Sequence, residues 1–159
     1  MNTSPELIGA PVKRVEDRRL LTGRGRYVAD LALPGMLHAA FLRSPHPHAR
    51  ITRVDATAAR GSAGVAAVFT GHDLREHARP IRAASRMAGY AATDMPPLAA
   101  DKVRYAGEAV AAVVAESRYV AEDAIERIAV DYEPLEAITD ARSATAAAAR
   151  SFTRAPRAM

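Results

Sequence analysis

Residues 38–51 read HAAFLRSPHPHARI, and this stretch predicts two strands and the turn between them. Leu37, Ala39 and Phe41 share one face of an extended chain, and Ala40 and Leu42 on the other face are also apolar. Apolar residues on both faces are typical of a strand that is buried on both sides. Pro45 and Pro47 fix φ and remove two backbone donors, so the strand ends before them. We therefore predict a buried strand, a stiff turn and a returning strand.

The turn carries two histidines, whose imidazoles are common metal ligands and proton carriers. His46 and His48 are two positions apart, so they can point the same way on an extended backbone. Two ligands do not complete a metal site, and no third ligand stands at a suitable spacing. We interpret both histidines as turn residues that are half exposed to solvent.

A second feature lies in the later half of the chain, where Val110–Ala115 reads VAAVVA. An unbroken apolar run of this length predicts a central strand. Tyr105, Gly107 and Glu108 stand at its entrance. A glycine beside a polar aromatic residue and an acid can allow close approach of a ligand or partner. It can equally form a bulge that starts the strand, and the sequence leaves both interpretations open.

The other elements follow from spacing and capping residues. Ser117 is a plausible N-cap for a helix that continues to about Arg127, and 128–135 reads as a strand stopped by Pro134. Before the later half of the chain we expect a short strand at Tyr27–Leu31, a turn at Pro34–Gly35 and a short helix ending at Gly61. A strand over 65–71 follows, and then a long loop over 72–97 with one helical turn near Asp73–Leu74. This order predicts an α+β domain with a mixed β-sheet and one or two packed helices.

The two ends differ in character from the body. Residues 1–24 are rich in proline, glycine and charge and read as an irregular arm. We expect the folded domain over residues 25–140. Residues 141–159 are dominated by alanine and arginine without a periodic apolar face, which predicts a disordered tail or a frayed helix.

Composition excludes several classes of protein. The 159 residues fit one domain, and with no cysteine the chain cannot supply disulfides, thiolate nucleophiles or iron–sulfur ligands. No apolar run is long enough to span a membrane, and no secretory signal is visible, so we expect a cytoplasmic protein. All 18 acidic residues and 18 of the 22 basic residues lie at or before Asp140. The positive excess is thus confined to the tail, and we do not expect nucleic-acid binding.

Motifs for self-contained chemistry are missing from the sequence. It has no GxSxG, HExxH or Walker pattern. The segment Gly23–Arg24–Gly25 lacks the third glycine and the following helix of a dinucleotide-binding loop. The residues alone therefore indicate an α+β domain without its own active site.

Three ordered segments resemble a known family. They are IGAPVKRVEDRRLLTGRGRYVADLALPGMLHAAFLRSPHPHARI (8–51), GVAAVFTGHDL (64–74) and PLAADKVRYAGEAVAAVVAESRYVAEDAIERIAVDYEPLEAITDARSA (97–144). Together they are similar to the start of molybdenum hydroxylase large subunits, a family of xanthine dehydrogenases, aldehyde oxidases and aerobic carbon monoxide dehydrogenases. The resemblance covers roughly residues 7–144 and corresponds to the family's α/β hammerhead domain.

The resemblance implies a redox role for the complete enzyme. Family members hydroxylate a carbon next to a heteroatom or carbonyl, or oxidise carbon monoxide, at a molybdenum–pterin cofactor. Electrons leave through iron–sulfur clusters and commonly FAD, often on separate subunits. The expected partners are thus a molybdenum-binding domain or subunit and iron–sulfur and FAD subunits. The family's cofactor loops and base lie in a longer region that this sequence does not contain, and Glu136 stands where the family commonly has proline.

The missing cofactor loops and base determine which function we expect for this chain. We expect no catalytic, cofactor-binding or metal-binding residue on this chain, which we interpret as the N-terminal hammerhead portion of an oxidoreductase large subunit. It would come from a truncated gene or a split subunit and be inactive alone. The alternative is a free-standing interaction or scaffold module of the same fold without catalytic activity. The residues that we expect at an interface with the other domain are Arg43, Ser44, His46, Tyr105, Gly107 and Glu108.

Overall fold

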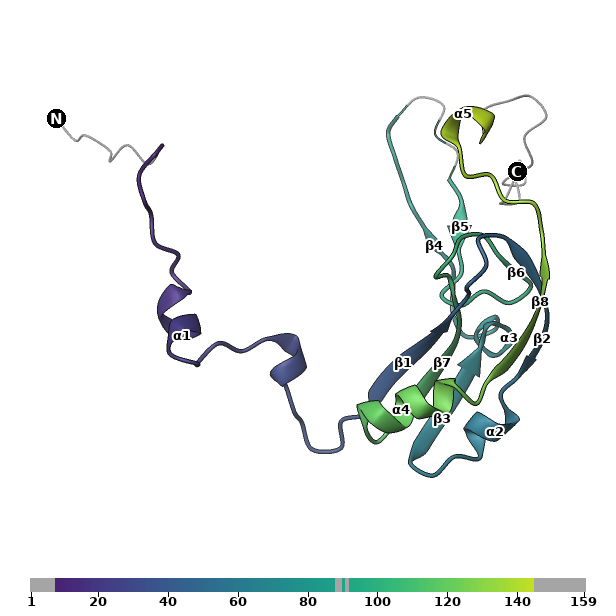
Figure 1. The fold of residues 1–159 in the computed structure, drawn as a ribbon, viewed down its shortest axis with the longest axis horizontal. Helices are drawn as coiled ribbons and strands as arrows, with labels where there is room; N and C mark the ends of the chain where they lie inside the picture. Colours follow the sequence, from purple (N-terminus) through teal and green to yellow (C-terminus); the bar gives the residue numbers. More distant parts are fainter. Residues whose placement is uncertain (1–7, 88–89, 91, 145–159) are drawn as a thin grey trace. The chain divides into compact units, whose positions relative to one another are not determined.

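The computed structural model describes residues 8–87, 90 and 92–144, and the chain divides into two units, Met1–Met36 and Leu37–Met159. The first unit contains helix α1 (Asp17–Leu21) and the single-turn 3₁₀ helix η1 (Val28–Asp30) (Figure 1). None of its described residues is buried, so this unit has no hydrophobic core of its own. The expected arm boundary at residue 24 lies inside this unit.

The predicted strand at Tyr27–Leu31 is wrong, because η1 occupies its centre. The Tyr27 backbone N–H donates to Asp30 Oδ2 at 2.8 Å, and the Asp30 N–H donates to the Tyr27 carbonyl at 3.0 Å. These local hydrogen bonds offer the backbone an alternative to a β-ladder. The expected turn at Pro34–Gly35 is present, with Gly35 at φ 73°.

The second unit begins with an antiparallel sheet of three strands. These are β1 (His38–Arg43), β7 (Ala109–Ala115) and β3 (Val65–Thr70), in the order β1-β7-β3. The prediction that Val110–Ala115 forms a central strand is confirmed. Val113 lies opposite Ala40 on one side and Val68 on the other, and it is fully buried.

Helix α4 (Arg118–Ile125) covers one face of this sheet (Figure 1). Ser117 is its N-cap, as predicted, since its Oγ accepts a hydrogen bond from the Val120 N–H at 3.2 Å. Ala121 and Ala124 are buried against the sheet. Small side chains on both elements let the helix backbone approach the sheet closely, so a core poor in aromatic residues still packs.

The prediction that β1 is buried on both faces is wrong. Ala40 and Leu42 pack on the core, whereas Ala39 and Phe41 face outward and Phe41 remains 49% exposed. β1 is an edge strand of a sheet with α4 on one face, so the apolar residues of its other face meet no element of the core.

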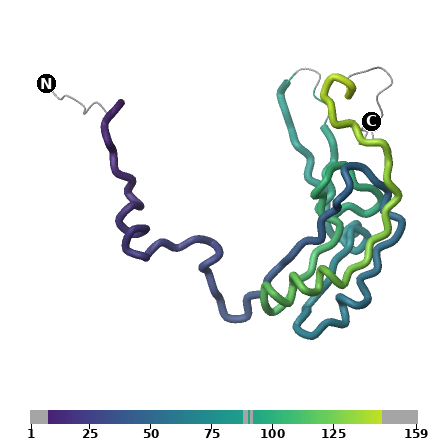
Figure 2. Tube along the Cα trace, in the orientation of Figure 1, coloured from purple at the N-terminus to yellow at the C-terminus, as the bar shows by residue number. Residues whose placement is uncertain are grey.

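A second antiparallel sheet contains β6 (Lys102–Val103), β2 (Ala49–Asp55) and β8 (Ala129–Pro134), in the order β6-β2-β8. The returning strand after the proline turn and the strand over 128–135 are thus confirmed. β2 and β8 are far apart in sequence and run side by side (Figure 2). Val54 and Val130 contact both hydrophobic clusters of the domain and so connect the two sheets.

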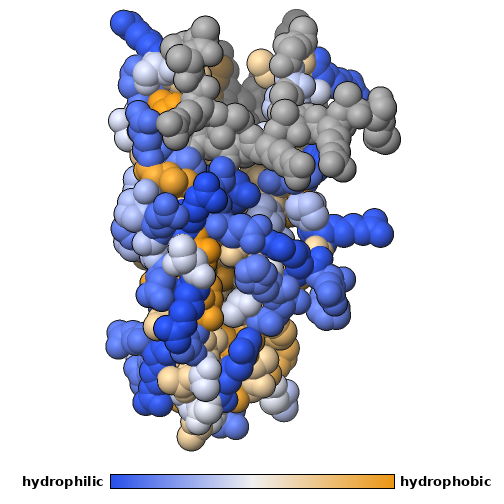
Figure 3. All heavy atoms as spheres, turned by 90° about the vertical axis from the view of Figure 1, so that its right-hand side faces the viewer, coloured by the Kyte–Doolittle hydropathy of each residue, from blue (hydrophilic) through white to orange (hydrophobic). Residues whose placement is uncertain are grey.

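The outer face of the β6-β2-β8 sheet is charged. Arg50 and Arg53 lie 3.7 and 3.9 Å from Glu133 and Asp131 on the neighbouring strand. Figure 3 views the molecule from this side and shows mostly hydrophilic side chains, with hydrophobic ones visible between them. Exposed pairs of this kind add little stability but keep the face compatible with water.

Short elements complete the domain. They are α2 (Thr57–Arg60), which ends at Gly61 as expected, α3 (Gly71–Leu74), the two-stranded ribbon β4 (Ile81–Arg82) and β5 (Asp94–Met95), and α5 (Ala141–Ala144). The helical turn near Asp73–Leu74 is confirmed as α3, whereas the ribbon was not expected from the sequence. Of the tail predicted over residues 141–159, the first four residues form α5, and the rest lies outside the described residues.

The α+β class is confirmed. The sequence predicted one mixed sheet, and the strand pairings recorded within residues 8–87, 90 and 92–144 are all antiparallel, in two sheets and a ribbon. Within those same residues, no helix has the length and apolar character that a membrane crossing requires.

Candidate functional site

Two turns that are distant in sequence meet at the ends of β1 and β7. We call them the corner, residues 43–46 and 105–108. The Ser44 N–H donates to the Glu108 carbonyl at 2.9 Å, and the Gly107 N–H donates to the Ser44 carbonyl at 2.8 Å. Arg43 Nη1 also donates to the Gly107 carbonyl at 2.9 Å, across 64 positions of sequence. The structure thus brings together all six residues that the sequence suggested as an interface.

The first turn is held by its own serine. Ser44 Oγ accepts a hydrogen bond from the His46 N–H at 3.0 Å and donates to the His46 carbonyl at 3.2 Å. The His46 ring lies 4.9 Å from the Tyr132 ring of β8. Burial raises the pKa of Tyr132 above its ordinary 10.0, and a hydrogen bond with Ser44 opposes that rise. The proline turn is therefore fixed on the second sheet as well as on β7.

The second turn requires glycine. Gly107 has φ 90°, in the left-handed region that other residues rarely adopt, and the Glu108 N–H donates to the Tyr105 carbonyl at 3.2 Å. The pairing of β1 with β7 is irregular just after Gly107. Leu42 pairs with Ala111 and Arg43 with Ala109, so the register shifts between Leu42 and Arg43. The two interpretations of this segment are compatible, because a tight turn starts the strand and also carries Tyr105 out to the surface.

Glu108 lies inside the protein and is 5% exposed. Its carboxylate accepts hydrogen bonds from the backbone N–H of Arg104 and, at 2.9 Å, from Arg104 Nη1. Arg104 was not among the residues singled out from the sequence. The signal that could have indicated it is the spacing of four between a basic and an acidic residue around a glycine turn.

Exposure divides the six expected interface residues into two groups. Ser44 and Glu108 are buried and hold the corner in shape, and Gly107 is half-buried. Arg43 and Tyr105 are exposed, with Tyr105 58% accessible, and His46 is half-buried. Arg43 and Tyr105 are thus the side chains of this set best placed to touch another protein.

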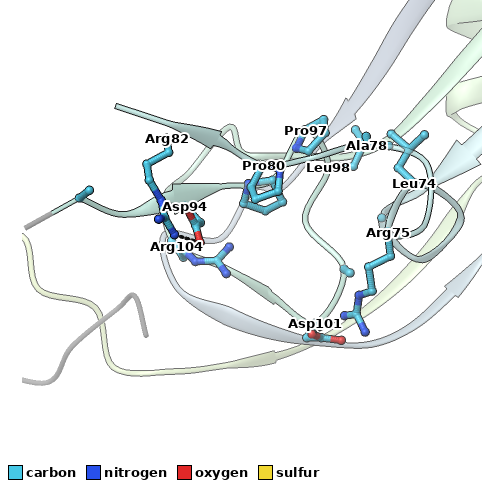
Figure 4. A pocket seen from close by; sticks show the side chains of 14 residues that line it. Leu74, Arg75, Ala78, Pro80, Arg82, Asp94, Pro97, Leu98, Asp101 and Arg104 are labelled. Carbon is cyan, nitrogen blue, oxygen red and sulfur yellow. Dashed lines mark hydrogen bonds and ion pairs between the residues drawn. The ribbon is translucent and has the colours of Figure 1, made fainter. Parts of the chain in front are cut away.

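A cavity of about 320 Å³ lies next to the corner, and its lining includes Arg104, which pairs with Glu108 of the corner (Figure 4). Leu74, Pro80, Pro97 and Leu98 give it an apolar wall. The charged side chains of the lining are paired. Arg82 lies 2.6 Å from Asp94, and Arg75 pairs with Asp101. Arg104 pairs with Glu108, which is not itself part of the lining.

These pairs leave the cavity without a preference for ligands of one charge. A hydrogen bond from Arg82 lowers the pKa of Asp94 below 3.8, and one from Arg75 does the same for Asp101. Both aspartates are thus ionised near neutral pH, and their charges offset those of the arginines. Among the residues that the structure describes, the lining contains no serine, cysteine or histidine that could act as a nucleophile or base.

The two histidines of the proline turn have different surroundings. His48 is 6% exposed, so the expectation that both are half exposed is wrong for this residue. Its Nδ1 lies 2.7 Å from the Glu136 carbonyl, and because a carbonyl can only accept, Nδ1 carries the proton. Among residues 8–87, 90 and 92–144, no group of three or more histidine, cysteine or acidic side chains is placed to hold a metal ion.

Comparison with known proteins agrees with this architecture. Residues 22–136 match the family model for the "aldehyde oxidase and xanthine dehydrogenase, a/b hammerhead domain". The chain is 48% identical over 136 residues to the nicotine 6-hydroxylase large subunit of Paenarthrobacter nicotinovorans, covering 86% of this chain and 17% of that protein.

Solved structures show the same relationship. Quinoline 2-oxidoreductase from Pseudomonas putida 86 superposes with a TM-score of 0.82 at 50% identity, covering 87% of this chain and 18% of that one. The Cu,Mo-CO dehydrogenase gives a TM-score of 0.74 at 43% identity, covering 89% and 17%. The chain thus spans less than a fifth of these relatives. It belongs to the aldehyde oxidase and xanthine dehydrogenase family, the molybdenum hydroxylases, and forms the a/b hammerhead domain of that family.

Proposed function

We propose that this chain serves as the hammerhead part of a molybdenum-cofactor-dependent hydroxylase or dehydrogenase large subunit. The observation that carries the proposal is the family match over residues 22–136. A molybdenum-binding region, on another chain or farther along the same one, would hold the molybdenum–pterin cofactor that supplies the redox chemistry. In this proposal the hammerhead part contributes no catalytic or cofactor-binding residue and is inactive by itself.

The remaining partners follow from the same proposal. Iron–sulfur and FAD subunits would carry electrons away, and the complete enzyme would work in the cytoplasm. Within it, the corner faces the molybdenum-binding region. Ser44, Gly107 and Glu108 fix the two turns, while the exposed Arg43 and Tyr105 make the contact. Arg43 suits this role, because its guanidinium can donate to several acceptors at once.

Purification of the tagged full chain from its native host tests the proposal. Molybdenum, iron and FAD are measured per chain, and the bound proteins are identified by mass spectrometry. We expect molybdenum to co-purify together with molybdenum-binding sequence. A lone, stable, metal-free monomer would contradict the proposal and favour the free-standing module.

A matched pair of variants tests the corner in the same preparation. Tyr105 and Tyr119 are both exposed, at 58% and 78%, but Tyr119 lies on α4, away from the corner. Tyr105→Ala is expected to lower the co-purified molybdenum, whereas Tyr119→Ala leaves it unchanged. Equal effects of the two variants would remove the corner from the proposed interface.

A further inference from the structure

Lysine is rare in this chain. Its 22 basic residues are 20 arginines and only two lysines, Lys13 and Lys102. Arginine stays charged in proteins, whereas a lysine amine can lose its proton and then act as a nucleophile. Lys13 is exposed and belongs to the first unit, whereas Lys102 is half-buried on β6, at the edge of the β6-β2-β8 sheet. Lys13 is therefore an internal control for the chemistry of Lys102.

Lys102 lies between two other positive charges. In the antiparallel pairing of β2 with β6, Arg50 is directly opposite Lys102. Side chains of directly opposite residues are on the same face of a sheet, and like charges at such positions are destabilising. Arg104 follows two positions after Lys102, and its Nη1 donates to the Lys102 carbonyl at 3.1 Å. One guanidinium is thus across the sheet from Lys102, and the other is next to it along the chain.

The two arginines have carboxylate partners, whereas Lys102 has none within ion-pair distance among the residues that the structure describes. Arg104 pairs with Glu108 at 2.9 Å. Arg50 lies 3.7 Å from Glu133 in an exposed pair, and such pairs are weak. An anion that reaches Lys102 therefore finds a group without a counter-ion, and Arg50 can turn from Glu133 to bind it.

The same surroundings make the Lys102 amine easier to deprotonate. Burial lowers the pKa of Lys102 below its ordinary 10.5, and the charges of Arg104 and Arg50 lower it further, while Glu108 opposes the change. A lower pKa increases the fraction of neutral amine near neutral pH. The neutral amine is the form that attacks a carbonyl carbon.

We propose that Lys102 is a site of acylation by acyl phosphates, with Arg50 and Arg104 binding the phosphate group. The neutral Nζ attacks the acyl carbon, and the bond between that carbon and the phosphate oxygen breaks. Inorganic phosphate leaves with the bonding electron pair and takes up the proton that Nζ loses. The product is an uncharged amide, so position 102 no longer repels Arg50 across the sheet.

The arginines favour acyl phosphates over uncharged acyl donors. A phosphate accepts charge-assisted hydrogen bonds from guanidinium groups, and two guanidiniums flank the amine. A phosphate held between them places its acyl carbon next to Nζ, which raises the rate of attack through proximity. Selectivity for the donor therefore distinguishes a built site from a lysine that is merely reactive.

Acetylation of the purified full chain by acetyl phosphate tests this inference. The chain is incubated at one fixed pH with acetyl phosphate or with the uncharged donor p-nitrophenyl acetate, and peptide mass spectrometry follows Lys102 and Lys13. With acetyl phosphate we expect Lys102 to react at least about fivefold faster than Lys13. The preference should be smaller with p-nitrophenyl acetate. It should disappear in concentrated urea, because the charge cluster forms only in the folded chain.

A matched pair of arginine variants tests the phosphate contact. Arg50 and Arg53 are both exposed on β2 and lie 3.7 and 3.9 Å from an acidic residue of β8, but only Arg50 is opposite Lys102. Arg50→Gln is expected to lower the rate of Lys102 acetylation by acetyl phosphate by about threefold or more. Arg53→Gln should leave that rate unchanged. Circular dichroism checks that both variants are folded.

Several results would overturn the inference. Equal rates at Lys102 and Lys13 would show that the cluster confers no reactivity. An equal preference with both donors would show that the phosphate is not bound, and equal effects of the two arginine variants would remove Arg50 from the site. A preference that persists in urea would come from the local sequence and not from the fold.

Discussion

At the scale of single residues, two arginine–glutamate pairs with the same spacing differ in importance. Arg118 and Glu122 are exposed on α4 at 2.8 Å, and pairs of that kind contribute a few tenths of a kcal/mol. Arg104 and Glu108 are also four apart, but the Glu108 carboxylate is buried and additionally accepts a backbone N–H. The burial of Glu108 could not be predicted from sequence, because the same spacing occurs in a solvated pair.

We predict that Glu108→Gln lowers the free energy of unfolding by about 2 kcal/mol, since it leaves the partly buried Arg104 guanidinium without its counter-charge. Glu122→Gln should cost no more than about 0.5 kcal/mol. Urea denaturation of both variants measures the difference. Equal losses would show that Glu108 has no special structural role.

Asp73 links stability to pH. Its Oδ2 accepts hydrogen bonds from the Thr70 N–H and hydroxyl at 2.8 and 2.9 Å and lies 2.9 Å from Arg60 Nη2. The backbone hydrogen bond from Thr70 holds the pKa of Asp73 below 3.8, and partial burial opposes this. A carboxyl whose pKa is lowered by folding stabilises the protein above its ordinary pKa, and this contribution is lost as pH falls through the lowered value.

We therefore predict that Asp73→Asn is less stable than the natural chain at neutral pH, by up to about 1 kcal/mol. The difference should shrink as pH falls below about 4, where the natural aspartate takes up its proton. Urea denaturation across this pH range tests the prediction. A difference that stays constant down to about pH 2.5 would show that the ionised carboxylate contributes nothing.

At the scale of elements, predictions succeeded where a strong local pattern coincided with burial. The apolar run of β7 and the serine cap of α4 identify both elements, because each pattern is satisfied by the core that forms around it. Predictions failed where a side chain competed locally, as Asp30 does in η1. The apolar residues on both faces of β1 suggested that both faces are buried. Which faces are covered depends on the strand order, and no local sequence pattern predicts that order.

The turn before β7 gives a prediction at this scale. Gly107 has φ 90°, and a Cβ there would meet no atom within 4 Å, so Gly107→Ala tests backbone strain alone. We expect a loss of about 1–2 kcal/mol. Gly61, with φ −84° and ordinary van der Waals contacts for a Cβ, is the control, and Gly61→Ala should change stability by less than about 0.5 kcal/mol. Similar values for both glycines in urea denaturation would contradict the left-handed turn.

At the scale of the whole molecule, the resemblance of ordered segments predicted the family, and the match over residues 22–136 confirms it. The grouping of Arg43, Ser44 and His46 with Tyr105, Gly107 and Glu108 could only be suggested, since pairing across 64 positions depends on the strand order. The pairing of both Phe41 and Phe69 with Ala112 escaped prediction for the same reason, because it requires β7 to lie between their strands.

The proposed role of this chain as the hammerhead part of a molybdenum enzyme is tested most directly by a domain exchange. The matching part of the Cu,Mo-CO dehydrogenase chain, to which this chain is 43% identical, is replaced by the present sequence. Molybdenum bound per purified chain is then measured, with a deletion of the same part as the control. We predict that the exchanged protein retains molybdenum at a level comparable with its parent while the deletion loses it. A folded exchange protein without molybdenum, or a deletion that retains it fully, would contradict the account.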